Sequence, residues 1–272
     1  MYAFGLEECG EYDKAREHAK RALSLNRQDC WATHALAHCY EMSSDYVDGI
    51  ELLESTVDDW SPCFMLACHN YWHNAVFYLE KGDIESALTI FDEQVETRAR
   101  HSGMMLDFVD GASLLARIQM DAGPSRVGAP RWRALLSQAD AHVDDHVLAF
   151  NDAHISMVYS ALDELSEEND VSLSEKQHNS LSNFIGKREG ADNWRVTRDI
   201  GAMLCDAICD FNASRYDVAF EKLYPIRTQI YHIGGSRAQA IYYSENFNNS
   251  FTRRALNPQN KLALGSSASR KA

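Results

Sequence analysis

The sequence predicts an all-α protein assembled from helix hairpins that stack side by side. Gly (14) and Pro (5) are sparse among its 272 residues, as expected of a helical rather than a turn-rich chain. Apolar residues recur at helical spacing along most of the chain, and no segment has a convincing strand pattern. Residues 65–91 hold a long helical pattern, a break at Gly82-Asp83 and a second helical pattern, which together predict one hairpin.

Two further hairpins precede this one at related spacing. Gly10 is followed by Tyr12, Ala15 and Ala19, which share one helical face. The pattern recurs 34 residues later from Ser44, and again from Gly82 after a short insertion near residues 60–62. Three units in register predict that each of these residues lies in the turn between two packed helices.

This order of residues resembles the tetratricopeptide repeat, a helix hairpin of about 34 residues. The resemblance implies a right-handed α-solenoid and one helical-repeat domain over residues 1–256. Its expected parts are a partial repeat (1–29), two repeats (30–62 and 63–98), degenerate helical hairpins (104–190), a repeat-like hairpin (193–232) and a terminal helix (236–256), followed by a disordered tail (257–272). Because Met1 falls inside the first helix of a repeat, we expect an N-terminally truncated chain.

The less regular part of the chain still shows helical patterns. We expect helices over residues 107–120, 131–143 and 143–165. The sequence Ser174-x-x-Gln177 is typical of a capping box and predicts the start of another helix. Gly234-Gly235 predicts the end of the last hairpin, since it lacks the Lys and Ser/Thr of a phosphate-binding loop.

Five motifs give a more specific resemblance. They are Cys30–Met42, Met65–His73, Asp107–Leu115, Phe150–His154 and His232–Gln239. Together they resemble the tetratricopeptide repeat protein 38 family over most of residues 1–239, whereas the stretch after Gln239 departs from it. The resemblance implies an all-α solenoid in a protein that is longer at its N-terminus, and it implies no particular biochemical activity.

The net charge and the cysteines limit the partners and the cellular compartment that the sequence predicts. The net charge of −14 argues against a nucleic-acid partner or an anionic membrane, since both need a basic surface. No apolar run is long enough to span a membrane, and no secretory signal is visible. The seven cysteines are odd in number and include no CxxC pair, which predicts reduced thiols in a cytoplasmic protein. Cys205 and Cys209, one helical turn apart, are interpreted as core thiols rather than as a metal or redox pair.

The resemblance also implies a concave groove lined by the first helix of each hairpin. Transferred residue by residue, the groove positions are Trp31, His34, His38, Glu41, His69, Trp72, Asp110 and Arg117, with His73 beside them, His154 nearby, and Phe4 and Glu7 from the partial repeat. We expect a non-enzymatic scaffold that binds a basic or neutral protein segment in this groove and needs no cofactor. Core packing is the competing role for Trp72.

The alternative is a metal-binding or hydrolytic protein. His34 and His38 are four residues apart, as are His69 and His73, and this spacing puts each pair on one helical face. Asp110 and His154 would add ligands from neighbouring helices, a donor set suited to zinc. Neither an H-E-x-x-H motif nor a cysteine pair supports a metal, and buried packing without a ligand is a third interpretation.

The sequence allows two roles for each of two carboxylates. Glu41 is three residues from His38 and is expected either to orient that ring or to be a solvated groove residue. Asp107 is expected to begin or cap its helix, although Asp107 and Asp110 would also make an acid–base pair.

Overall fold

The chain is all-α in the computed structural model, which describes residues 1–165, 172–187, 192–236 and 239. Within these ranges the regular structure is helical, and no strand occurs. Two compact units divide the chain, the first over Met1–Gln138 and the second over Ala139–Gly235. None of the helices in the described ranges has the length and apolar character needed to cross a membrane.

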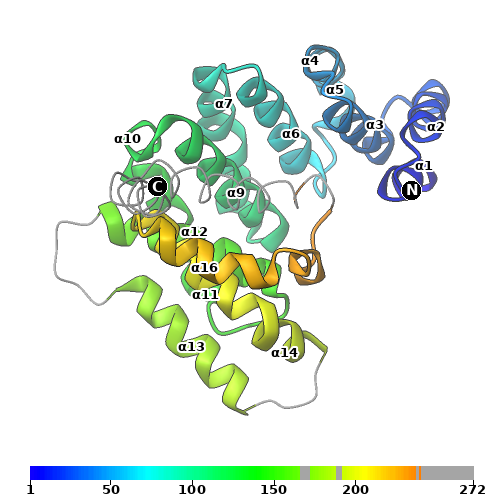
Figure 1. The fold of residues 1–272 in the computed structure, drawn as a ribbon. Helices are drawn as coiled ribbons and strands as arrows, with labels where there is room; N and C mark the ends of the chain where they lie inside the picture. The colour runs from blue at the N-terminus through cyan, green and yellow to red at the C-terminus, as the bar shows by residue number, and fades with distance from the viewer. Residues whose placement is uncertain (166–171, 188–191, 237–238, 240–272) are drawn as a thin grey trace, which may run out of the picture. The chain divides into compact units, whose positions relative to one another are not determined.

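The first unit is built from short and medium helices in close succession (Figure 1). They are α1 (Tyr2–Glu8), α2 (Tyr12–Leu25), α3 (Cys30–Met42), α4 (Tyr46–Ser55), α5 (Val57–Trp60), α6 (Ala67–Glu80), α7 (Ile84–Ile90), the π-helical turn η1 (Phe91–Val95), α8 (Glu96–Ser102), α9 (Met105–Ala122), α10 (Pro124–Val127) and the start of α11 (Ala129–His142).

The second unit continues the helical pattern. Its elements after α11 are α12 (Ala149–Leu165), α13 (Leu173–Lys187), α14 (Asp192–Val196), the π-helical turn η2 (Thr197–Gly201), α15 (Ala202–Asn212), α16 (Tyr216–Ile226) and the short 3-10 helix η3 (Ile230–Ile233). Here α12 packs against α13 and α15, and α15 pairs with α16.

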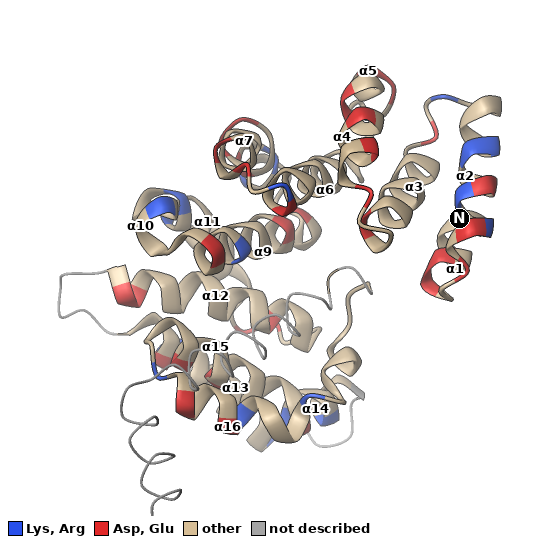
Figure 2. Cartoon of the chain, turned by 45° about the horizontal axis from the view of Figure 1, so that its top comes forward, with Lys and Arg blue, Asp and Glu red and all other residues tan. Residues whose placement is uncertain are grey.

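Alternate helices of the first unit form a row. α1 packs against α3, α3 against α6, and α6 against α9, while α2, α4 and α7 each flank a member of this row. α3 and α6 carry few charges, in contrast to α2 (Figure 2). Because apolar and small residues occur all round these two helices, both are buried on most sides.

Four of the hairpin turns share one backbone geometry. Gly10, Ser44, Gly82 and Ser214 have φ of 80°, 59°, 79° and 58°, and each residue that follows donates its N–H to the carbonyl five residues earlier. This is the Schellman motif that ends a helix with one left-handed residue. The predicted turns at residues 10, 44 and 82 are confirmed, and two of the four positions hold Ser where Gly would fit with less strain.

α3 begins where expected because Asp29 caps it. The Asp29 carboxylate accepts a hydrogen bond from the Ala32 backbone N–H at 3.0 Å, which satisfies one free donor of the first turn. α3 runs over Cys30–Met42, as predicted. Gly49 then lets α4 approach α6, since a Cβ at that position would lie 2.5 Å from the Phe77 ring.

Two sequence-based boundaries are corrected. α11 ends at His142 and α12 begins at Ala149, so the helix expected from residue 143 starts six residues later. The segment between them contains His146, whose φ of 46° is incompatible with a continuous helix. At the start of α13 the capping acceptors are Asp163 and Ser172 rather than Ser174. All of the expected tail (257–272), and the expected terminal helix (236–256) apart from residues 236 and 239, lie outside the described residues.

Candidate functional site

The site lies where α3 and α6 pack together. Their two histidine pairs face each other, so that His34 lies 4.8 Å from His69 and His38 lies 4.7 Å from His73, measured between ring centroids. One possible ligand nitrogen from each of these four rings lies within 4.8 Å of the others. The spacing of four residues explains this convergence, because it places both members of a pair on one helical face. We call these residues the histidine cluster.

Three of the four histidines have a carboxylate beside Nδ1, and in two of them, His69 and His73, the pair is hydrogen-bonded. His69 Nδ1 lies 2.7 Å from Asp110 Oδ1, and His73 Nδ1 lies 2.9 Å from Glu41 Oε2. His38 Nδ1 lies 3.2 Å from an oxygen of Glu7. Each carboxylate favours the tautomer that carries its proton on Nδ1 and so leaves Nε2 as an electron-pair donor.

The carboxylate beside His38 is not Glu41, the one that sequence spacing suggests. Glu41 is close enough in sequence to orient His38, but in the structure it bonds to His73 on the neighbouring helix. The carboxylate beside His38 Nδ1 is instead that of Glu7 in α1. Thus the three supporting acids come from three elements, α1, α3 and α9.

His34 completes the cluster without a carboxylate. Its Nε2 lies 2.9 Å from Nε2 of His38, a distance at which one ring donates a proton and the other accepts it. His34 Nδ1 and His73 Nε2 are buried without a hydrogen-bond partner in the described part of the chain. His38 Nδ1 is likewise without a hydrogen bond among the described residues, and unpartnered buried nitrogens carry a desolvation cost.

Burial sets the protonation of the cluster. It lowers the pKa of His34 and His73 well below their ordinary range, and the neighbouring histidines lower it further. Burial acts in the same direction on His69, but the Asp110 carboxylate outweighs it and raises the pKa of that ring. Near neutral pH, His34 and His73 are therefore neutral, which is the form that binds a metal.

Trp72 forms a wall of the cluster. It stacks on His69 with 5.3 Å between ring centroids and an interplanar angle of 5°, and its indole N–H donates to Ser113 Oγ at 2.9 Å. The Arg117 guanidinium lies 5.7 Å from the centre of the same indole. Trp72 is fully buried, which agrees with core packing and leaves no face for a peptide.

The remaining groove candidates are also inside the protein. Buried side chains include His34, His38, Glu41, His69, His73, Asp110 and Arg117. Trp31 is half-buried and packs against His34 at 5.9 Å between ring centroids. The residues expected to line an open groove thus form a closed polar cluster in the first unit.

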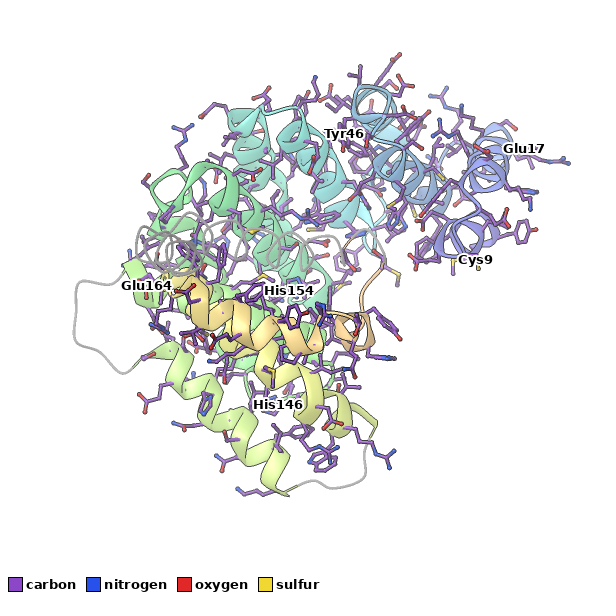
Figure 3. The ribbon with its side chains drawn as sticks, viewed as in Figure 1. Cys9, Glu17, Tyr46, His146, His154 and Glu164 are labelled. Atoms are coloured by element: carbon purple, nitrogen blue, oxygen red, sulfur yellow. The ribbon has the colours of Figure 1, made fainter. Side chains whose placement is uncertain are left out.

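His154 lies on α12 in the second unit (Figure 3). It is buried, and its Nδ1–H donates to the Phe150 carbonyl at 2.7 Å. The two cysteines of this unit behave as core thiols, since Cys205 is buried, Cys209 is half-buried, and burial raises the pKa of Cys209 to about 11.

Cys68 is the residue that the sequence analysis missed. Its thiol approaches Asp107 and Asp110, so one ligand atom from each of the three residues lies within 4.8 Å of the others. The sequence signal was weak, because the two acids beside the Cys68 thiol, Asp107 and Asp110, are 39 and 42 residues further along the chain. Asp107 lies in the first turn of α9, as expected, but it is buried and does not cap the helix.

Comparison with known proteins adds no assignment. No family model matches the chain, and no solved structure matches it.

Proposed function

We propose that this chain binds a divalent transition-metal ion, zinc by its donor set, through the histidine cluster. The observation that carries this proposal is the buried carboxylate beside Nδ1 of three imidazoles, hydrogen-bonded at His69 and His73 and in 3.2 Å contact at His38. Metal-binding histidines almost always use their second nitrogen in this way, because the bond fixes the ring and raises its basicity. Histidines that merely packed together would not need these carboxylates.

The distances suit an ion after a small rearrangement. With zinc–nitrogen bonds of about 2.0–2.1 Å, neighbouring nitrogens of a tetrahedral site are roughly 3.3–3.4 Å apart. The two Nε2 atoms of His34 and His38 are 2.9 Å apart, and the whole set lies within 4.8 Å. Small side-chain rotations therefore separate the close pair and draw the others together.

The same cluster allows two kinds of metal site. Four bound imidazoles would fill a tetrahedral zinc site, as in structural sites, whereas three would leave one position for water and permit hydrolysis. Peptide binding by these side chains ranks lower, because a docked segment would first have to expose them. A metal ion would bind these side chains while they remain buried.

The solenoid and family interpretations are proposals of the same kind. The shared turn geometry at residues 10, 44 and 82 and the row α1–α3–α6–α9 support tetratricopeptide-like stacking in the first unit. The motifs Cys30–Met42 and Met65–His73 support the tetratricopeptide repeat protein 38 family, and they contain the four histidines. An alignment in which these histidines vary independently of Glu7, Glu41 and Asp110 would contradict a shared metal site.

Elemental analysis of the untagged protein tests the metal proposal. After reconstitution with zinc and removal of free ion, we expect at least one equivalent per chain, with one equivalent lost from a His34→Gln/His73→Gln variant. The matched control is His18→Gln/His178→Gln, which removes two exposed histidines and should keep the ion. Less than roughly a tenth of an equivalent in the reconstituted wild type would reject the proposal.

Cell fractionation tests the cytoplasmic location that accompanies this proposal. The seven cysteines are free thiols in the structure, which fits a reducing compartment. Recovery of the endogenous protein with secreted or luminal markers would contradict it.

A further inference from the structure

We infer that the first unit contains a second cation site, formed by Cys68, Asp107 and Asp110, which takes a zinc-class ion through one thiolate and two carboxylates. This inference does not need the histidine cluster to bind metal, because no ligand is shared. Asp110 is the one residue that touches both, with Oδ1 on His69 and Oδ2 left for the second site.

Unpartnered buried oxygens are the first argument. Asp107 is 1% exposed and Asp110 is 0% exposed, yet Asp107 Oδ1 and Asp110 Oδ2 have no hydrogen-bond partner among the described residues. The Cys68 thiol is buried beside them, where it is hydrogen-bonded to Asp107 and makes a long contact with the Val95 carbonyl at 3.9 Å. A buried carboxylate oxygen without a donor is expensive, and a cation satisfies two such oxygens at once.

Charge is the second argument. Two buried carboxylates and a thiol lie together, and the compensating cations near them are the Arg98 guanidinium and His69, which is itself shared with Asp110. A divalent ion would supply the charge that these groups lack and would displace the thiol proton on binding.

The donor set selects the class of ion. A thiolate is a soft ligand that calcium and magnesium avoid, whereas zinc accepts sulfur together with carboxylate oxygen. Three protein ligands also leave one position of a tetrahedral ion for another group.

A pocket gives this site contact with the outside. A cavity of about 260 Å³ is lined by residues that include Asp107, Arg98, His101 and Ser102. Asp107 thus borders both the ligand set and the cavity. A small molecule in the cavity would meet the ion at its fourth position, with Arg98 nearby to receive an anionic group.

Cobalt(II) substitution of the full chain tests the inference, since thiolate ligation produces a near-ultraviolet charge-transfer band that nitrogen and oxygen ligands do not. We expect the band to grow to saturation in the wild type. It should be lost in Cys68→Ser, and Asp107→Asn should weaken cobalt binding at least tenfold. Cys205→Ser, which removes a buried thiol of the second unit, is the matched control and should retain the band.

The outcomes separate this inference from the proposed function. A band that survives in the His34→Gln/His73→Gln variant supports the second site even if the histidine cluster binds nothing. Bound cobalt without the band, or a band that persists in Cys68→Ser, overturns the inference and leaves the histidine site standing. Far-ultraviolet circular dichroism identifies a misfolded Cys68→Ser protein, and Asp107→Asn, which keeps the thiol, then decides: unchanged cobalt affinity in that variant also overturns the inference.

Discussion

Gly49 offers the sharpest test of how the first unit brings α4 and α6 together. A Cβ at this position would lie 2.5 Å from Cε2 of Phe77 and 2.8 Å from two further ring atoms. Ordinary contact begins at 3.4 Å, so Gly49→Ala must move α4 or the buried ring by about 0.9 Å. The Phe77 ring in turn packs on His73, with 6.3 Å between centroids, so the displacement reaches the histidine cluster.

The expected magnitude comes from two opposing effects. Adding a methyl group to a packed core costs about 1–3 kcal/mol, whereas replacing Gly by Ala inside a helix gains about 0.8–1 kcal/mol. Gly5 of α1 isolates the second effect, since its Cβ would meet nothing within 4 Å. Gly49→Ala should therefore be about 1–3 kcal/mol less stable than Gly5→Ala, because both changes restrict the unfolded chain equally.

Urea unfolding followed by circular dichroism measures this difference, and hydrogen exchange at the α4 and α6 amides shows whether it is local. We also expect weaker zinc binding in Gly49→Ala and partial recovery on adding Phe77→Leu, which replaces a rigid ring by a smaller, adaptable side chain. If Gly49→Ala is as stable as Gly5→Ala, the close approach of α4 to α6 is wrong.

Three further predictions follow from the same unit. Glu41→Gln should weaken zinc binding about 10–100-fold by calorimetry, since it leaves an acceptor for His73 but removes the charge that raises its basicity; unchanged affinity would show that this carboxylate does not support the ligand. Asp29→Ala should destabilise the protein by about 0.5–2 kcal/mol through loss of the α3 cap, with Asp58→Ala, at an exposed position of α5, as the charge-matched control in the same urea experiment. Without metal, the pKa of His34 is lower in the folded protein than its value of about 6.5 in the unfolded chain. Its contribution to folding stability is therefore complete above that pH and is lost as the pH falls. Between pH 7.5 and 5.5 the wild type should lose more thermal stability than His34→Gln, and equal losses would contradict a neutral buried His34. The charged and titratable groups that act on this ring, His38, His69, His73 and the N-terminus, are the same in both proteins.

The sequence was most informative where local physical chemistry decides the structure. Glycine at residues 10 and 82 and the recurrence at residue 44 were enough to place three hairpin turns, because each turn needs one left-handed residue. The capping of α13 was missed for the opposite reason. Its acceptors include Asp163, ten residues before the first donor, and no local pattern predicts such a partner.

The histidine cluster was predictable only in part. Spacing of four residues showed that His34 would share a face with His38, and His69 with His73, and the repeat register put the two faces on adjacent helices. The carboxylate partners were not predictable, since they lie 31–41 residues from their histidines along the sequence, and proximity in sequence wrongly favoured Glu41 with His38. Periodicity identifies which face a residue occupies but not what covers that face, so an open groove and a buried cluster have the same pattern.

The energetics of burial favour the proposed ligand role of the cluster over a purely stabilising one. Burying ionisable groups carries a desolvation penalty of several kcal/mol per charge, which hydrogen bonds and mutual attraction repay only in good geometry. Here four imidazoles and three carboxylates are buried. Several of their atoms have no hydrogen bond within the described part of the chain: His34 Nδ1, His38 Nδ1, His73 Nε2, Asp110 Oδ2 and both carboxylate oxygens of Glu7. Well-packed apolar residues of similar size would stabilise the same helices at least as well. With a cation bound, the polar cluster would stabilise the helices more than apolar residues do. The unpartnered nitrogens would become ligands, and the positive charge of the ion would attract the supporting carboxylates. Zinc should accordingly raise the unfolding temperature of the wild type well above that of the metal-free protein, and an apolar replacement of the four histidines should be stable without zinc and indifferent to it.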